Sequence, residues 1–386
     1  MSGAALRIAA LRWEPYALPF VRPFATAGGR LGERRGFVLR VQDESGAWGV
    51  GEAAPLPEFG AEDLATCEAA LRAWSESLPG RDVQSRFDAP CEAPPLFGLG
   101  DAATAPTAAH ALESALLDLA ARRAGLPLAR WLLSGALQAP AAVAVNATLG
   151  ATEPAQTVLA AQQAVRQGYR TLKLKVGVDA AAAEQARLRA VREAVGPAVR
   201  LRIDANGAWG REEALARLER WAPLDIEYAE QPVPADDLDG LAWLAARSPV
   251  PVAADESIRT PADAERLLAR QAAAVLVLKP MLLGGALTTL RIARAALSAG
   301  VPVVVTTVLE GIYGRLCALH VAAAVAALHQ DALHSAALQG VAGLPAEPPA
   351  CGLATGALLA RDLLPEPPTP RDGVWALPAA AGLGCV

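Results

Sequence analysis

The sequence predicts an α/β protein in which a parallel (β/α) barrel follows a smaller α+β domain. In the middle of the chain, five short apolar runs each end in charged residues. These charges stand 29, 26, 25 and 24 residues apart: Lys175, Asp204, Glu230, Asp255 and Lys279. One strand–helix unit takes roughly 30 residues, so each unit delivers a charged side chain at the same end of successive strands. In a barrel, reactive groups lie at the carboxyl ends of the strands in this way.

The alternation of side chains along the predicted strands places these charges on one face. Residues i and i+2 share a face, so Lys173 lies beside Lys175. By the same rule Arg202, Asp204 and Asn206 line up. Three converging carboxylates would repel one another unless a cation lay between them, and Mg²⁺ prefers oxygen ligands of this kind. The lysines come before and after the carboxylates, so in a closed barrel they would face each other across its centre.

Composition excludes several classes of protein. The 386 residues are 53% hydrophobic and 19% charged, which suits a large core and not a disordered chain. The net charge of −5 leaves no basic footprint for nucleic acid. Arg7 and Arg12 interrupt the apolar N-terminal stretch, and the uncharged run at 131–152 is too polar to span a membrane. We therefore expect no nucleic-acid partner and no membrane partner.

Cysteine and histidine form no site pattern. The cysteines are odd in number and scattered, with no C-x-x-C pair, so we expect reduced thiols in a cytoplasmic protein, without a metal or redox role. None of the four histidines follows a strand in the motif region, so histidine catalysis is not expected.

Residues 1–130 are expected to form the α+β domain. Gly-rich and Pro-rich segments separate its strands and helices, and Gly125 ends the last helix before Pro127. The expected elements are strands at 5–16 and 35–50, loops at 22–32 and 51–59, and helices at 61–78 and 108–124.

Residues 131–356 are expected to form the barrel, and 357–386 a segment that runs back over the first domain. The first strand is expected at 141–149, followed by helices at 153–167, 180–195 and 211–221. The seventh strand is expected at 301–310, a long helix at 312–328, and an eighth strand with a further helix within 351–364. The Ala-, Gly- and Pro-rich residues 331–350 carry no assignment.

Taken in order, the motifs LKLKVG, RIDANGAW, EQP, ADES and LKPMLLGG resemble the enolase superfamily, in its muconate lactonising subgroup. The stretches PFATAGG, GVGEAAPLPEFGAEDL, TTVLE and GLATGALLARDLL are most similar to those of o-succinylbenzoate synthases. The resemblance covers nearly the whole chain. It implies a modified (β/α)7β barrel of the TIM type, with an α+β capping domain built from the N-terminus and the C-terminal tail. It further implies that the loops around 22–32 and 51–59 close over the barrel mouth.

The resemblance also implies a reaction. The expected enzyme is a metal-dependent hydro-lyase that forms o-succinylbenzoate from a succinyl hydroxycyclohexadiene carboxylate, in menaquinone or phylloquinone synthesis. A proton α to a carboxylate is very weakly acidic, and its removal leaves a dianionic enediolate. Bound Mg²⁺, or Mn²⁺, stabilises that charge as it develops.

Residue roles follow from the same resemblance. It makes Lys175 the base, and then the acid that protonates the departing hydroxyl. Lys279, on the opposite side, stabilises the enediolate. The implied metal ligands are Asp204, Glu230 and Asp255.

Other residues are expected to support these. Lys173 is a cationic neighbour that helps a lysine base to lose its proton, and Arg202 is expected to hold Lys175 or the substrate. Glu256 is expected behind the metal ligands or in an ion pair. In the family's S-S-x-x-E pattern this chain has Thr in both Ser places. The expected substrate contacts are Thr306, Thr307, Glu310 and Asn206.

Alternative activities remain open on sequence. A racemase or epimerase of N-succinyl or other N-acyl amino acids would use the same two lysines for two-base proton transfer. Dipeptide epimerases of the subgroup tend to carry D-x-D at the eighth strand, where this chain has Gly352, Leu353 and Ala354. Muconate cycloisomerase has less support from the N-terminal loops. A Schiff-base aldolase using Lys279 leaves the carboxylates unexplained, and a non-catalytic scaffold leaves the complete motif set unexplained.

Overall fold

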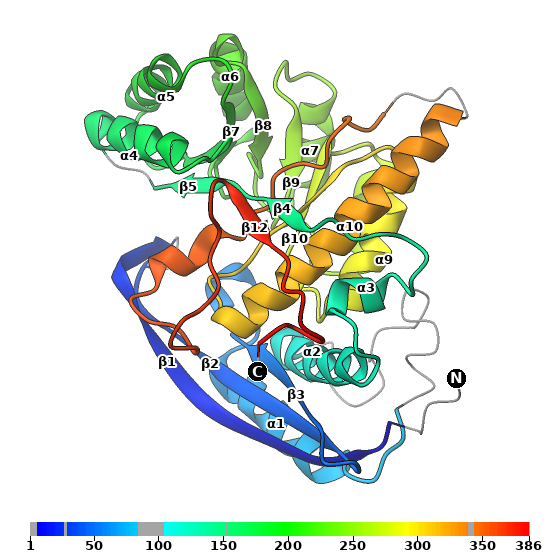
Figure 1. Cartoon of the computed structure of the whole chain (residues 1–386). Coiled ribbons are helices and arrows are strands. Elements are labelled where there is room, and N and C mark those ends of the chain that lie inside the picture. Colours follow the sequence, from blue (N-terminus) through cyan, green and yellow to red (C-terminus); the bar gives the residue numbers. More distant parts are fainter. Residues whose placement is uncertain (1–5, 27–28, 84–103, 151–152, 339–342, 386) are drawn as a thin grey trace.

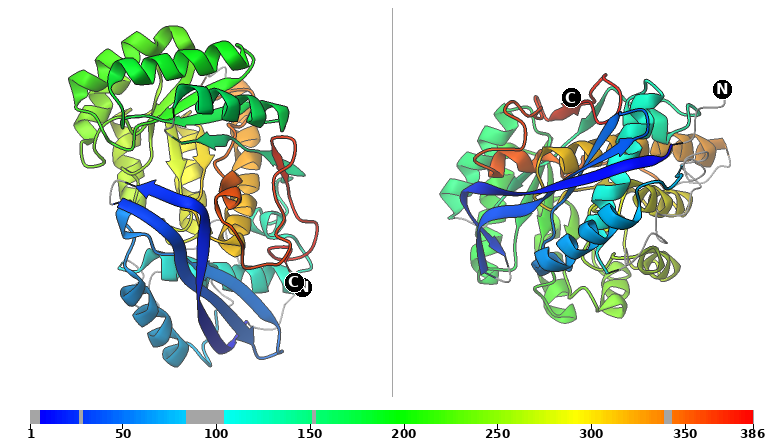
Figure 2. Two further views of the ribbon diagram at one scale, coloured as in Figure 1. Left: turned by 90° about the vertical axis from the view of Figure 1, so that its left-hand side faces the viewer. Right: turned by 90° about the horizontal axis from the view of Figure 1, so that it is seen from below.

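The computed structural model describes residues 6–26, 29–83, 104–150, 153–338 and 343–385. Two bodies make up this part of the chain: a barrel of parallel strands surrounded by helices, and a smaller α+β domain packed against it (Figures 1 and 2). The predicted fold class, an α/β barrel with a capping domain, is confirmed.

The capping domain is a three-stranded antiparallel sheet that packs on helices. The sheet consists of β1 (Ile8–Thr26), β2 (Gly29–Asp43) and β3 (Trp48–Ala53), and the helices are α1 (Leu64–Ser77) and α2 (Pro106–Arg123). Helix α2 lies very close to β3, because Gly51 has no side chain: a Cβ there would lie 2.8 Å from the backbone carbonyl carbon of Ala111. The glycine therefore sets the distance between helix and sheet.

The glycine-rich segment 22–32 differs from its prediction as a loop. Strands β1 and β2 continue through it, with Phe24 opposite Leu31 and Thr26 opposite Gly29. Strand pairing gives the backbone N–H and C=O groups hydrogen-bond partners, whereas those of a loop would bond to water. A shift in register between Pro19 and Phe24 bends the hairpin. The tip, residues 27–28, lies outside the described residues.

The barrel follows the predicted alternation of strands and helices. Seven parallel strands lie side by side in chain order. The strands and the helices between them are β5 (Ala147–Leu149), α4 (Pro154–Arg166), β6 (Thr171–Lys175), α5 (Ala181–Val195), β7 (Arg200–Asp204), α6 (Arg211–Trp221), β8 (Ile226–Glu230), α7 (Leu238–Ala245), β9 (Val252–Ala254), α8 (Pro261–Ala269), β10 (Val275–Leu278), α9 (Ala286–Ser298) and β11 (Val303–Val305). Lys175 is level with Asp204, and Asp204 with Glu230, so three charges lie in one layer at the strand ends.

Two residues take the place of an eighth strand. Cys351 donates its N–H to Ala144 (2.8 Å), and Gly352 donates its N–H to Val305 (2.9 Å), which joins the two sides of the barrel. The predicted first strand is divided, because β4 (Ala142–Ala144) pairs with β12 (Val374–Ala376) and β5 pairs with β6.

The helix predicted within 351–364 is a single short 3₁₀ helix, η4 (Ala354–Leu358). It stops there because Leu359 turns to bridge Phe20 of β1. The chain then continues through β12 to α2, where Leu383 donates its N–H to Asp118 (2.7 Å).

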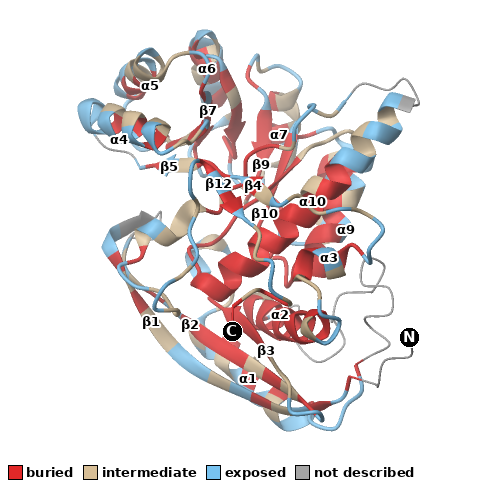
Figure 3. Cartoon of the chain, viewed as in Figure 1, coloured by how far each residue is buried: buried red, intermediate tan, exposed pale blue. Residues whose placement is uncertain are grey.

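Helix α10 (Ile312–Leu338) is ten residues longer than predicted, since no Gly or Pro interrupts it before Gly340. Among the described residues it is the one helix long and apolar enough to cross a membrane. However, 72% of its most apolar window is buried inside the fold, between the barrel and the cap (Figure 3). The burial of α10 is therefore that of a core helix in a folded domain.

Glu113 joins the two domains and makes stability depend on pH. It lies buried on α2 and accepts a hydrogen bond from Leu287 N (3.0 Å) at the start of α9. Burial raises the pKa of Glu113 to about 7. In an unfolded chain a glutamate titrates near 4.3, so between these values the folded state holds a proton that the unfolded state has lost. The contribution of Glu113 to stability therefore falls as pH rises from about 4.3 to about 7.

We predict that Glu113→Gln, which keeps an acceptor for Leu287, raises the free energy of unfolding at pH 8 by up to about 3 kcal/mol. At pH 4.5 it should change little. Denaturant unfolding at both pH values measures this, with the exposed Glu193→Gln on α5 as control. An equal effect of Glu113→Gln at both values would contradict the prediction.

Candidate active site

A small cavity of about 80 Å³ lies at the carboxyl ends of the strands, below the cap. Its lower wall is apolar and comes from Tyr228, Val277 and Val304, inside the barrel. Leu56 and Phe59 contribute from the cap. The charged residues of its wall are Lys173, Lys175, Asp204, Glu230, Asp255 and Lys279. The structure thus gathers six of the charged residues that the motifs place at strand ends, and leaves Glu256 outside this wall.

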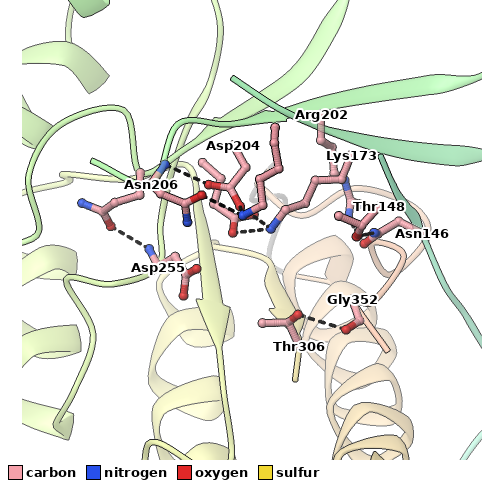
Figure 4. Close-up of polar contacts among 12 residues, drawn as sticks. Asn146, Thr148, Lys173, Arg202, Asp204, Asn206, Asp255, Thr306 and Gly352 are labelled. Carbon is pink, nitrogen blue, oxygen red and sulfur yellow. Dashed lines mark hydrogen bonds and ion pairs between the residues drawn. The ribbon is translucent and has the colours of Figure 1, made fainter. Parts of the chain in front are cut away.

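Lysines and carboxylates form a connected set of ion pairs on one side of the cavity (Figure 4). Lys175 Nζ donates to Asp204 Oδ2 (2.6 Å) and to Asn206 Oδ1 (2.7 Å). Lys173 Nζ lies 2.8 Å from the same Asp204 oxygen and donates to Glu230 Oε1 (2.5 Å). On the other side, Lys279 donates to both oxygens of Asp255.

Burial sharpens the electrostatics of this set, since the three carboxylates are each less than 5% exposed. Burial alone would raise the pKa of Asp204, but the ammonium groups of Lys173 and Lys175 hold it well below its usual range. The pKa of Glu230 is instead raised well above its usual range, by burial and by the charge of Asp204. Burial disfavours the charged form of Lys173 and Lys279, but the neighbouring carboxylates outweigh it and raise the pKa of both.

The donor set suits a hard divalent cation. As placed, the carboxylates accept from lysines, and no three acidic, histidine or cysteine side chains gather round one point in the described part of the chain. Nevertheless, Asp204, Glu230 and Asp255 supply carboxylate oxygens from three neighbouring strands. Burial raises the pKa of Glu230, and the charges of Asp204 and Asp255 raise it further. Oxygen ligands at a buried, mutually repelling site are what Mg²⁺ would stabilise.

Gln231 holds two of these strand ends together. Its Oε1 accepts from Asp255 N (2.9 Å) and from Ser257 N (3.3 Å), and its Nε2 donates to Ser257 Oγ (2.8 Å). Its backbone has a positive φ of 38°, a conformation that a non-glycine residue adopts only where surrounding contacts fix it. The sequence predicts no role for Gln231. Its position in EQP, directly after the strand-end carboxylate Glu230, is the feature that could have indicated one.

Asn206 links the two sides of the charged set. It also has a positive φ, of 45°. Its Oδ1 accepts from Lys175, and its Nδ2 donates to Glu256 Oε1 (2.8 Å). Asn206 lines the cavity, whereas Glu256 stands behind it, next to Asp255. Asn206 is therefore placed to fix the position of the Lys175 ammonium group.

Thr306 and Thr307 line the opposite wall, where the barrel closes. Both hydroxyls donate to Gly352 O, at 3.0 and 3.3 Å, and Thr307 also bonds Thr355 (2.8 Å). This wall presents hydroxyl groups and backbone, with no charged side chain among its described residues.

Arg202 differs from its predicted role beside Lys175 or the substrate. It is fully buried, lies below the cavity and does not line it. Its guanidinium donates to Glu227 (2.5 Å) and to Ala350 O (2.6 Å), and lies 4.7 Å from the centre of the Tyr228 ring. Because Ala350 precedes the two residues that close the barrel, Arg202 stabilises the closure.

Glu310 also differs from its predicted place at the substrate. It is buried outside the cavity wall, and its carboxylate accepts from Val308 N (2.5 Å). Burial raises its pKa to about 7. The S-S-x-x-E pattern gives the spacing but not the direction of the side chain, which here turns toward the interface with the cap.

That interface fixes the proline-rich loop over the cavity. Glu52 of β3 accepts from the Tyr16 hydroxyl (2.5 Å) and from the N–H groups of Gly311 (2.6 Å) and Gly314 (2.9 Å), at the start of α10. Arg34 donates to Pro55 O (2.6 Å) and Val308 O (3.3 Å). These contacts hold the loop so that the ring of Phe59 lies 5.7 Å from Lys279 Nζ.

Histidine and cysteine lie away from the cavity wall. His110 Nδ1 is within hydrogen-bond distance of Glu52 O (2.9 Å), and His320 Nδ1 accepts a hydrogen bond from Ala129 N (3.1 Å). Burial lowers the pKa of both histidines to about 4. Four cysteines are free and buried, and Cys91 lies outside the described residues.

Comparison with known proteins agrees with this geometry. Residues 156–386, more than half of the chain, match the family described as enolase C-terminal domain-like, and residues 11–105 match the family of MenC N-terminal domains. A dipeptide epimerase from Enterococcus faecalis, solved in complex with Mg and the dipeptide L-Leu-L-Tyr, superposes with a TM-score of 0.84. Its sequence is 27% identical, and the match covers 98% of this chain and 99% of that one.

Relatives with different activities are similar at comparable levels. The L-Ala-D/L-Glu epimerase of Bacillus subtilis is 33% identical over 82% of this chain and 85% of its own length. The o-succinylbenzoate synthase of Thermosynechococcus vestitus is 33% identical over 80% and 87%. Muconate cycloisomerase 1 of Pseudomonas putida is 29% identical over 95% and 92%. The chain therefore belongs to the enolase superfamily, in its muconate lactonising subgroup.

Proposed function

We propose that this enzyme is a cytoplasmic, metal-dependent o-succinylbenzoate synthase that dehydrates a succinyl hydroxycyclohexadiene carboxylate in menaquinone or phylloquinone synthesis. The observation that carries the proposal is the pair of lysines, Lys175 and Lys279, on opposite sides of a cavity walled by three buried carboxylates. The matches to the MenC N-terminal family and to o-succinylbenzoate synthases support this choice of reaction.

The lysines divide the work in this proposal. Lys175 removes the α-proton of the substrate, held in position by Asp204 and Asn206. The same ammonium group then returns that proton to the departing hydroxyl on the same face. Lys279 stays charged and stabilises the negative charge that develops on the substrate carboxylate. A divalent cation held by Asp204, Glu230 and Asp255 would supply further positive charge beside that carboxylate.

Racemisation of N-succinyl or other N-acyl amino acids is the second candidate. It is favoured by the same two facing lysines, because a two-base reaction needs one on each side. Dipeptides are poorer substrates for this cavity, since their ammonium group would need a carboxylate at the barrel closure. The closure has Gly352 instead, and any side chain at this position would collide with the Thr306 side chain. Assay of the purified protein with the cyclohexadiene substrate and with an N-succinyl amino acid tests the two candidates directly.

Metal dependence gives the first prediction of function. Excess chelator should abolish turnover, and Mg²⁺ or Mn²⁺ should restore it. Asp204→Ala should lower kcat/KM by roughly 100-fold or more while circular dichroism shows an intact fold. The exposed Asp239→Ala on α7 is the control and should leave both kinetic constants unchanged. Full activity in chelator would contradict the assignment of a metal site.

The two lysines give the second prediction. Lys175→Ala and Lys279→Ala should each lower the rate of dehydration by about 10²–10⁴-fold, through loss of the base and of electrostatic stabilisation respectively. Exchange of the α-proton of an N-succinyl amino acid in D₂O, followed by NMR, separates the reactions. Under racemase chemistry each variant exchanges only the enantiomer whose proton faces the remaining lysine. Rapid exchange of both enantiomers by the native enzyme without any dehydration would reject the synthase proposal in favour of the racemase.

Gln231 gives the third prediction. Gln231→Ala removes the acceptor that positions Asp255, so metal affinity should fall about 10–100-fold, as for other residues that orient metal ligands. Calorimetric titration with Mn²⁺ measures this without substrate. Gln163→Ala, on the exposed face of α4, is the matched control. Unchanged Mn²⁺ affinity of Gln231→Ala would show that Asp255 holds its position without this contact.

A further inference from the structure

The reaction cavity is too small for the proposed substrate. Its volume is about 80 Å³, whereas sites for small molecules usually measure roughly 300–1,000 Å³. A six-membered ring with a carboxylate and a succinyl arm therefore has to extend beyond it. The direction in which the substrate extends determines which residues bind the distal end of its succinyl arm.

A second cavity of about 390 Å³ adjoins the first. Phe59, Asp255, Val277 and Lys279 line both cavities. The ring of Phe59 and the side chain of Lys279 therefore form a common wall, which a rotation of the ring would open. The second cavity, here called the side chamber, lies between the cap residues 59–62 and the β9–α8 segment 255–261.

The side chamber contains a cation with no ion-pair partner. The guanidinium of Arg259 makes no ion pair or hydrogen bond within the described ranges. It lies against the loop at Gly60, where a Cβ would come within 3.0 Å of its central carbon. All three acidic side chains of the chamber have partners. Asp255 accepts from Lys279, and Glu256 accepts from Asn206. Glu62 accepts from Thr107 at the start of α2 (3.0 Å from N and 2.6 Å from Oγ1).

The reaction cavity itself offers no such cation. Lys173, Lys175 and Lys279 are all paired with carboxylates. At the opposite wall, Thr306 and Thr307 direct their hydroxyl groups to Gly352 O. A second carboxylate on the substrate therefore finds its complementary charge in the side chamber.

We propose that the active site continues past Phe59 into the side chamber, where Arg259 binds a distal carboxylate of the substrate. This inference rests on the proposed function, because that function supplies a substrate with two carboxylates. Phe59 then acts as a movable partition that packs along the arm between the reacting ring and Arg259.

The test compares two ligands that differ only in the distal carboxylate: o-succinylbenzoate and 2-butanoylbenzoate. Dissociation constants are measured by calorimetry in saturating Mg²⁺. Arg259→Gln should weaken binding of o-succinylbenzoate about tenfold, the effect of losing one partly exposed charged hydrogen bond. It should leave the binding of 2-butanoylbenzoate unchanged, and Arg259→Lys should restore most of the affinity. Arg266→Gln, an exposed arginine on α8 outside the chamber, is the matched control and should bind both ligands as the native enzyme does.

The inference is overturned if Arg259→Gln keeps the native preference for o-succinylbenzoate. Loss of that preference in Arg30→Gln, on the hairpin of the cap, would then assign the distal carboxylate to Arg30 instead. Failure of the proposed function is distinguished by repeating the comparison with N-succinyl-valine and N-butanoyl-valine. If the native enzyme binds the valine pair and not the benzoates, the proposal of a synthase is refuted. The effect of Arg259→Gln on binding of the valine pair then still tests whether the side chamber binds the distal carboxylate. Binding of neither pair refutes the proposed function and, with it, the ligand assigned to the chamber.

Discussion

The burial of three carboxylates against three lysines at the strand ends is the constraint on which the rest of the structure depends. Removing such charges from water costs several kcal/mol per ion, and the attraction between partners seldom returns more than that. Replacing buried ion pairs by well-packed apolar residues of similar volume is often neutral or stabilising. The ion pairs therefore point to selection for chemistry, and the surrounding structure has to hold repelling groups such as Asp204 and Glu230 in fixed positions.

Three parts of the structure meet this demand. Parallel pairing sets the depth of each charge, because Lys175, Asp204 and Glu230 are level in register. Positive φ angles at Asn206 and Gln231 turn the chain sharply after two strands, so that both side chains fold back onto the charged layer. The cap then covers the charged groups from above, since Glu52 and Arg34 fix the loop that carries Phe59.

The sequence predicts those parts of the fold and site that repeat along the chain. Lys175, Asp204, Glu230 and Asp255 could be placed because regular spacing and strand alternation determine both their position and their direction. Arg202 shares the parity of Asp204 but lies a layer deeper, and spacing alone does not give depth. Glu310 follows β11 by several residues, where no strand pairing fixes the side chain. The two-residue closure at Cys351 and Gly352 has too few residues to show any periodicity.

The same distinction separates the chemistry of this enzyme from its specificity. Relatives named as epimerases, synthases and cycloisomerases have similar overall identity to this chain, so overall similarity does not identify the substrate. Substrate specificity therefore has to come from the cavity walls that contact the rest of the substrate. Here those walls are uncharged at Gly352 and Thr306, apolar at Phe59 and cationic at Arg259. A substrate that matches all three has a second anionic group on the Arg259 side and no ammonium group at the barrel closure.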